Sequence, residues 1–162
     1  MLLVLCVDRD DDLGRKTEAE TPVVGRAAVR EAAVELATAD PEDSDVNVLF
    51  EGLRIADSVD EPVEVAAVTG EAGRDIEAGR QIRRQLDWVL GGLDADEVSA
   101  IVVTDGAQDE SVLPVIRSRV TVDGVSRVVV RQAQDLESMY YTIKQVLDDP
   151  ETRGTLLVPL GI

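Results

Sequence analysis

The sequence predicts an α/β fold, a three-layer sandwich with helices on both faces of a mainly parallel sheet of about four to five strands. Short apolar runs alternate along the chain with segments whose apolar residues recur at helical spacing. Strands that alternate with helices indicate βαβ units, and right-handed crossovers would make the architecture Rossmann-like. The chain has 162 residues, 44% of them hydrophobic, which suits one domain with one core.

The first part of the chain predicts a buried strand, two helices and a second strand. The opening run is continuously apolar, as expected of a strand buried on both faces. Asp40 and Pro41 suggest a helix start, because aspartate is a favoured N-cap and proline suits the first helical position. A loop is expected up to about residue 24. The predicted elements are, in order, a strand over 2–7, helices over 25–38 and about 40–58, and a strand over 62–70.

The second part continues the same alternation. Asp109 is expected to cap a short helix, and Asp123–Gly124 offers a turn at which the fourth strand could fold as a hairpin. The predicted elements are a helix from about 73 to 90, a strand over 98–104, a helix from 109, a fourth strand within 119–131 and a last helix over about 135–149. Residues 1–154 are therefore expected to form one α/β domain.

The charge balance narrows the classes of partner and cofactor. There are 33 acidic against 16 basic residues, giving a formal charge of -17, and only Lys16 and Lys144 are lysines. An acidic, lysine-poor surface is typical of a haloarchaeal cytoplasmic protein, and it argues against nucleic acid as a partner. Because the chain has no histidine and one cysteine, a metal site would need oxygen ligands, which suit Mg²⁺, Mn²⁺ or Ca²⁺ rather than zinc.

Carboxylates follow two of the predicted strands. Asp8, Asp10 and Asp12 come directly after the first strand, and Asp105 and Asp109 follow the strand at 98–104. If these two strands are neighbours, their carboxyl ends bring Asp105 close to Asp8 at a switch point, where ligands bind in open α/β sheets. The sequence thus predicts a Mg²⁺ site made from these five aspartates. The alternative is a solvated acidic turn, which salt adaptation alone would explain.

Basic residues interrupt the acidic pattern in one segment. Residues 117–131 hold four arginines and one acid. Arginine forks fit phosphate oxygens, so an anion-binding role is predicted, with ion pairing to acidic neighbours as the alternative. The candidate anion-binding residues are Arg9, Lys16, Arg119, Arg127 and Arg131. Together with the aspartates they suggest a phosphate-bearing, nucleotide-like ligand held through the metal.

The Asp8-x-Asp10 pair is also similar to the nucleophile and acid of haloacid-dehalogenase-like phosphatases. In that alternative, Asp8 attacks a phosphoester, Asp10 acts as the acid and Mg²⁺ assists. The expected lysine has no good candidate, and Asp11 stands where a small or branched residue is usual. A third alternative is a scaffold or homodimerisation domain without a ligand.

Six stretches of the chain carry recognisable motifs: 7–16, 21–26, 40–47, 105–110 with Leu113–Pro114, 118–120 and 128–132. Together they resemble an archaeal family of unknown function, domain-of-unknown-function family 373. The resemblance implies a cytoplasmic α/β domain followed by membrane helices, and no established activity. It implies that the apolar tail 155–162 opens a truncated membrane segment. We therefore expect a sensory or regulatory domain at the cytoplasmic face of the cell membrane, with its own membrane segment as a partner.

Overall fold

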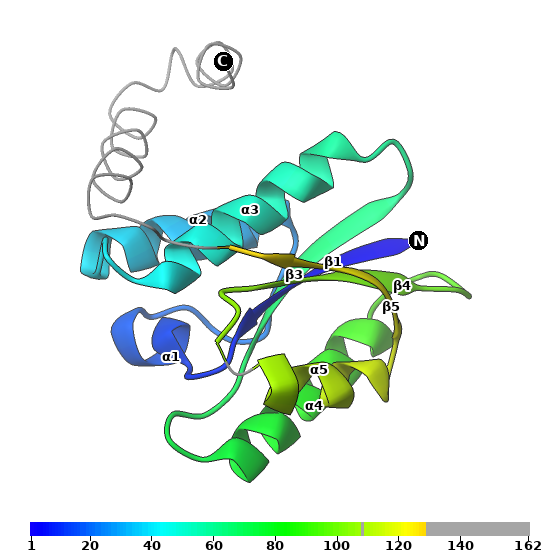
Figure 1. Cartoon of the computed structure of the whole chain (residues 1–162). Coiled ribbons are helices and arrows are strands. Elements are labelled where there is room, and N and C mark those ends of the chain that lie inside the picture. Colours follow the sequence, from blue (N-terminus) through cyan, green and yellow to red (C-terminus); the bar gives the residue numbers. More distant parts are fainter. Residues whose placement is uncertain (108, 129–162) are drawn as a thin grey trace, which may run out of the picture. The chain divides into compact units, whose positions relative to one another are not determined.

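The computed structural model describes residues 1–107 and 109–128, which form a five-stranded sheet with helices packed on it (Figure 1). The strands are β1 (Leu2–Asp8), β2 (Val23–Val24), β3 (Val63–Thr69), β4 (Ser99–Thr104) and β5 (Thr121–Arg127). The helices are α1 (Asp12–Lys16), α2 (Arg26–Ala39), α3 (Ser44–Ser58), α4 (Asp75–Gly91) and α5 (Asp109–Arg117). The last predicted helix, the tail at 155–162 and Arg131 lie outside the described residues.

The strand order is β2-β3-β1-β4-β5. Strands β3, β1, β4 and β5 run parallel, and only the two-residue β2 is antiparallel to its neighbour. Helices α2 and α3 cover one face of the sheet, and α4 and α5 cover the other (Figure 1). The predicted three-layer α/β class with a mainly parallel sheet is confirmed.

Strand β1 is the centre of this architecture. All seven of its residues are buried, since both its edges are paired and helices cover both its faces. On the α4–α5 side, Leu3, Leu5 and Val7 enter a cluster with Ile82 and Leu86 of α4. Because Asp8 closes this rigid strand, its carboxylate has a well-fixed position at the carboxyl edge of the sheet.

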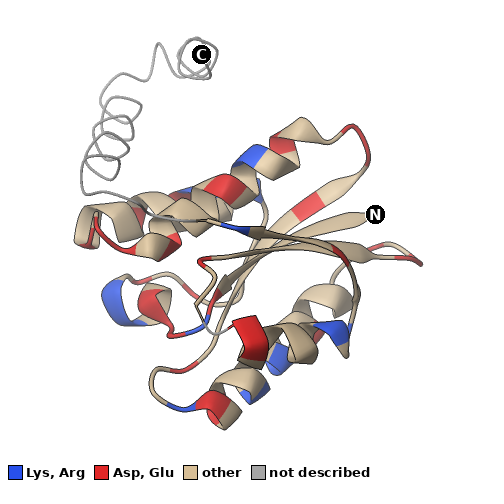
Figure 2. Ribbon diagram, in the orientation of Figure 1, with Lys and Arg blue, Asp and Glu red and all other residues tan. Residues whose placement is uncertain are grey.

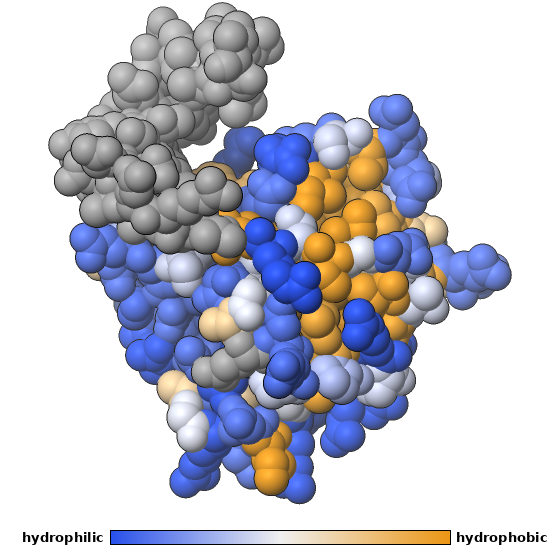
Figure 3. Space-filling model, viewed as in Figure 1, coloured by the Kyte–Doolittle hydropathy of each residue, from blue (hydrophilic) through white to orange (hydrophobic). Residues whose placement is uncertain are grey.

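The hairpin expected at Asp123–Gly124 does not form, and β5 is instead a single strand parallel to β4. Ala100 pairs with Val122 and Ile101 pairs with Gly124, so Asp123 is the extra residue of a β-bulge. A two-residue turn would have needed an antiparallel return strand. The space-filling view shows hydrophobic surface near β5, as fits the partly buried residues of this edge strand (Figure 3).

Two local expectations in the first half were wrong. Helix α3 is capped by Asp43, whose side chain accepts a hydrogen bond from the N–H of Asp45, so Asp40–Pro41 precede the helix. The stretch expected to be a loop up to residue 24 contains α1 and β2. Both are too short, at five and two residues, to show a period in the sequence.

Gly52 is where α3 approaches β1 most closely. A Cβ on Gly52 would lie 2.3 Å from Sγ of the buried Cys6. We expect Gly52→Ala to lower the free energy of unfolding by about 1–3 kcal/mol, because overfilling a packed core forces shifts. In a Cys6→Ala background the same change should cost much less. Chemical denaturation of the four proteins measures this coupling, and an equal cost in both backgrounds would contradict it.

Candidate metal and ligand site

The candidate site lies where the chain changes from one face of the sheet to the other. The connection from β1 to β3 passes through α2 and α3, whereas the connections through α4 and α5 use the opposite face. The switch point is therefore between β1 and β4, whose parallel pairing confirms the neighbourhood assumed from the sequence. Asp8 ends β1 and Thr104 ends β4, so their carboxyl ends open onto this point.

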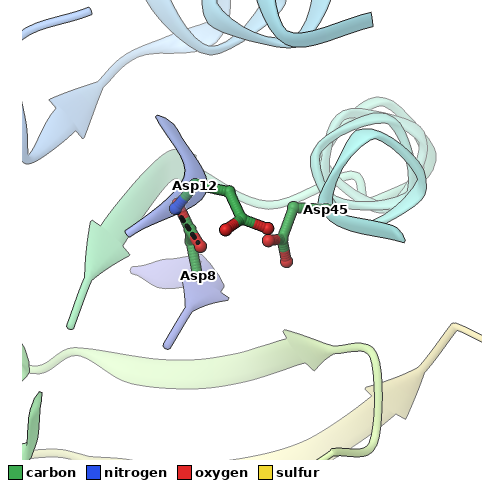
Figure 4. A group of neighbouring side chains, drawn as sticks. All are labelled: Asp8, Asp12 and Asp45. Atoms are coloured by element: carbon green, nitrogen blue, oxygen red, sulfur yellow. Dashed lines mark hydrogen bonds between the residues drawn. The ribbon is translucent and has the colours of Figure 1, made fainter. Parts of the chain in front are cut away.

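Three carboxylates converge beside this switch point (Figure 4). Asp8, Asp12 and Asp45 each offer one oxygen, and these oxygens all lie within 4.8 Å of one another. Asp8 comes from the end of β1, Asp12 opens α1, and Asp45 lies in the first turn of α3. Such a group of oxygen ligands suits a hard divalent cation such as Mg²⁺.

The turn after β1 explains why Asp12 returns over Asp8. Asp11 adopts a left-handed conformation with φ of 60°, which aspartate tolerates better than most residues, and accepts a hydrogen bond from the N–H of Gly14. The Asp8 carboxylate accepts hydrogen bonds from the N–H of Asp12 at 3.0 Å and of Leu13 at 2.8 Å. Leu13 is fully buried and anchors the turn. The short helix α1 thus holds Asp8 and Asp12 as one unit.

Burial and mutual proximity make this group costly to ionise. Burial raises the pKa of Asp8 to about 6, against hydrogen bonds from Asp45 and the α1 backbone that favour its charged form. Burial and the charge of Asp8 raise the pKa of Asp45 far above its usual value. Burial also raises the pKa of Asp12. Without a cation, the group therefore keeps at least one proton, which a bound metal would replace.

The raised pKa of Asp8 sets a pH dependence. Native Asp8 keeps its proton up to about pH 6, whereas the unfolded chain loses it near pH 3.8. Its contribution to stability is thus complete below about pH 4 and lost as the pH rises through 6. We expect the stability of the metal-free wild type, relative to Asp8→Asn, to fall by roughly 2–3 kcal/mol over that window, at 1.36 kcal/mol per pKa unit. Denaturation at pH 4, 5, 6 and 7 tests this, and a difference that rises with pH would contradict it.

Nearby basic side chains are held by other carboxylates. Lys16 Nζ donates to Asp40 Oδ2 at 2.8 Å and to Asp43 Oδ2 at 2.7 Å, and these partners raise its pKa. Arg15 pairs with Asp12 at the exposed side of the turn. Within the described residues, no arginine or lysine forms an ion pair with Asp8 or Asp45. These two buried carboxylates therefore lack a protein countercharge.

A small pocket adjoins the group on the β4 side. It has a volume of about 100 Å³, and Arg9, Asp12, Ser44, Asp45 and Asp105 contribute to its lining. The Arg9 side chain is only 9% exposed. Its Nη atoms bind Asp10, Asp75 and the carbonyl of Glu71, but its buried Nε has no hydrogen-bond partner. A buried cation with an unused donor thus lies in the wall of the same pocket as two of the carboxylates.

Of the predicted metal ligands, Asp8 and Asp12 lie in the group and the other three do not. Asp10 pairs with Arg9 instead. Asp105 lines the pocket, where it accepts a hydrogen bond from Ser44 Oγ at 2.9 Å. Asp109 is the first residue of α5, where it binds Thr104 Oγ1 at 2.8 Å.

Among the predicted anion-binding residues that the structure describes, only Arg9 lines the pocket. Arg127 is at the carboxyl end of β5, but its Nε donates to Asp109 Oδ2 at 2.6 Å. Arg119 precedes β5, at the opposite end of the strand, and its Nε lies 3.4 Å from Asp87 Oδ1. For these two arginines the structure shows ion pairing, the alternative that the sequence left open.

The sequence did not single out Asp45. The signal available was the acid-rich stretch 40–45, which was interpreted as the start of a helix and as part of the family motif 40–47. Asp45 reaches Asp8 because α3 runs antiparallel to β1, which places its N-terminus at the carboxyl edge of the sheet. That proximity depends on packing between segments 37 residues apart in sequence.

The fold and this site together define an α/β domain with a triad of aspartates, two of them buried, at the carboxyl edge of its sheet. The chain belongs to the family described as domain of unknown function DUF373, whose sequence profile matches residues 1–162. The family resemblance found in the motifs is thereby confirmed.

Two archaeal relatives are similar over most of the chain. An uncharacterised protein of Archaeoglobus fulgidus is 49% identical over 163 residues, covering 99% of this chain and 47% of the relative. An uncharacterised protein of Methanocaldococcus jannaschii is 37% identical over 151 residues, covering 90% of this chain and 40% of the relative. The chain thus spans less than half the length of these relatives. No solved structure matches it.

None of the helices within residues 1–107 and 109–128 is both long and apolar enough to cross a bilayer.

Proposed function

We propose that this domain binds a divalent cation, Mg²⁺ by the chemistry of its ligands, at Asp8, Asp12 and Asp45. The observation that carries the proposal is the convergence of three carboxylate oxygens within 4.8 Å, two of them on aspartates that are buried without a basic partner. Burying charges that repel each other costs free energy unless a proton or a cation compensates them. A bound metal would supply that compensation at neutral pH.

We further propose that the metal and Arg9 together hold a phosphate-bearing, nucleotide-like ligand in the adjoining pocket. Support comes from the position of the pocket at the switch point and from the unpartnered Nε of Arg9 in its wall. The acid triad alone would repel an anion, so the metal must bind for phosphate to bind. Arg9 would then supply one charge-assisted hydrogen bond.

Binding without turnover is the role that these contacts support. The hydrolase alternative needs Asp10 beside Asp8, but the Asp10 carboxylate binds Arg9 and is not part of the triad. A sensory role follows as a proposal from the length of the relatives, of which this domain would be one part. In that proposal the domain lies at the cytoplasmic face of the membrane of a salt-adapted archaeon and signals occupancy to a membrane segment.

Thermal unfolding tests whether the domain binds a metal and a phosphate compound. The measurement is made in about 1 M KCl, because that salt screens the general repulsion within an acidic chain. Mg²⁺ is added first, followed by inorganic phosphate, ADP or ATP. We expect an additional rise in Tm for one phosphate compound only when Mg²⁺ is present, and its loss in Arg9→Gln. A phosphate effect without metal would contradict the proposed order. A metal effect with no phosphate effect would leave a cation site alone, and no effect of either would favour the scaffold alternative.

A further inference from the structure

The outer surface of α4 carries an exposed ridge with an unusual composition for this chain. Arg80, Arg84 and Trp88 recur every four residues, so they lie in one row along the helix, and all three are exposed. Trp88 is the only tryptophan of the chain, and it is 66% exposed. Among the described residues, Arg80 pairs with Glu77 at 3.6 Å and Arg84 donates a hydrogen bond to Gln81 at 2.7 Å, both within α4. A large apolar side chain beside two arginines is thus left in water.

The loop that follows α4 carries the opposite charge. Asp94, Asp96 and Glu97 are exposed, and their side chains make no ion pair within the described part of the chain. Figure 2 shows this loop projecting between α4 and β4, with acidic residues near its tip. Positive charge therefore lies four and eight residues before Trp88, and negative charge lies six, eight and nine residues after it.

We propose that this surface binds a second copy of the chain, in a two-fold dimer whose axis passes near Trp88. In a two-fold interface the same patch of both copies is in contact. Residues that precede Trp88 in one copy therefore meet residues that follow Trp88 in the other copy. Antiparallel packing of the two α4 helices would place each Trp88 against its counterpart. Arg80 and Arg84 of each copy would then face Asp94, Asp96 and Glu97 of the partner.

The order of the charges along the chain agrees with this arrangement. Arg80 precedes Trp88 by eight residues, or about 12 Å of helix at 1.5 Å per residue. Asp96 follows Trp88 beyond the end of α4 at Gly91, in the loop that leads to β4. The ion pairs would set the orientation, and burial of two tryptophans would supply most of the affinity. One helix and one loop make a small interface, so we expect a weak, concentration-dependent dimer.

Charge reversal tests the pairing with the intact 162-residue chain. We expect light scattering in about 1 M KCl, where the screening length is about 3 Å, to show a mass that rises toward twice the monomer with concentration. Arg80→Glu with Arg84→Glu should abolish the dimer, as should Asp94→Arg with Asp96→Arg. Mixing these two variants should restore a dimer, because each basic surface then meets an acidic one. Trp88→Ala should abolish association, and Arg30→Glu with Arg54→Glu, on α2 and α3, should leave it unchanged.

The outcomes are decisive for this surface. A wild type that stays monomeric up to several hundred micromolar would overturn the proposal and leave the ridge for an acidic partner protein. Dimers that persist in both charge-reversed variants would place the interface elsewhere, which also overturns it. Circular dichroism confirms that each variant is folded. Emission of Trp88 that shifts to shorter wavelength with concentration supports burial at the axis.

Discussion

Replacing Asp45 with asparagine is expected to stabilise the metal-free protein at pH 8 and to abolish its stabilisation by Mg²⁺ or Mn²⁺. Without metal, the Asp45 carboxyl is buried against Asp8 and Asp12. Burial is the largest cause of its raised pKa, and these two neighbours raise the pKa further. At pH 8 folding must leave a proton on this group, and an uncharged amide avoids that cost and can donate a hydrogen bond to Asp8. Since each pKa unit corresponds to 1.36 kcal/mol, a relief on the order of 2 kcal/mol is expected.

Although Asp45→Asn should stabilise the metal-free protein, it should reduce the additional stability that a bound metal provides. For the wild type, a metal at 100 times its dissociation constant adds about 2.7 kcal/mol to the free energy of unfolding. Asp45→Asn loses one of three carboxylate ligands, and so does Asp8→Asn. We therefore expect little or no rise in Tm with metal for either variant. Isothermal titration with Mn²⁺ measures the binding directly, in parallel with thermal unfolding.

Asp10→Asn is the matched control for both measurements. It removes a carboxylate from the same turn, but one that pairs with Arg9 and is not part of the triad. This variant should keep most of the metal response. If Asp45→Asn is less stable than wild type without metal and still responds to metal, then Asp45 is a structural hydrogen-bonding residue and the triad is not the binding site.

The regular elements were predictable because their signals are local. The unbroken apolar run 2–7 predicted a strand buried on both faces, and the apolar spacing in α4 predicted its inward face, with Ile82 and Leu86 now in the core. The bulge at Asp123 could not be predicted in this way. It depends on the pairing of β5 with β4, and the sequence offers the same two residues for a turn.

The site was predictable only in part, because some of its residues are brought together by packing between distant segments and not by local sequence. Asp8 and Asp12 follow one strand and are fixed by one turn, so their proximity could be predicted from the sequence. Asp45 joins them through the packing of α3 on β1, which no local pattern encodes. Conversely, Arg127 and Lys16 are neutralised by aspartates 18 and 24–27 residues away in sequence. The rarity of basic residues made them stand out as anion ligands, yet in an acidic chain each one readily finds a carboxylate.

Gly70→Ala is expected to cost about 3 kcal/mol of stability, at the upper end of the range for overpacking. Gly70 follows β3 beside the site, and its N–H donates to the carbonyl oxygen of Asp8 at 2.9 Å. A Cβ there would lie 2.2 Å from the carbonyl oxygen of Arg9 and 3.1 Å from Cβ of Ala78. A backbone oxygen cannot rotate away as a side chain can, so the turn after β1 must move.

That movement links stability to the site, because the same turn carries Asp12. We expect Gly70→Ala to weaken metal binding as well, although residue 70 provides no ligand. Gly91→Ala is the matched control, since a Cβ at this position in the last turn of α4 meets nothing within 4 Å. Chemical denaturation and Mn²⁺ titration of both variants measure the two effects. A Gly70→Ala protein that is destabilised but binds metal like wild type would contradict this link. It would show that a shift of the turn after β1 does not disturb the position of Asp12 in the triad.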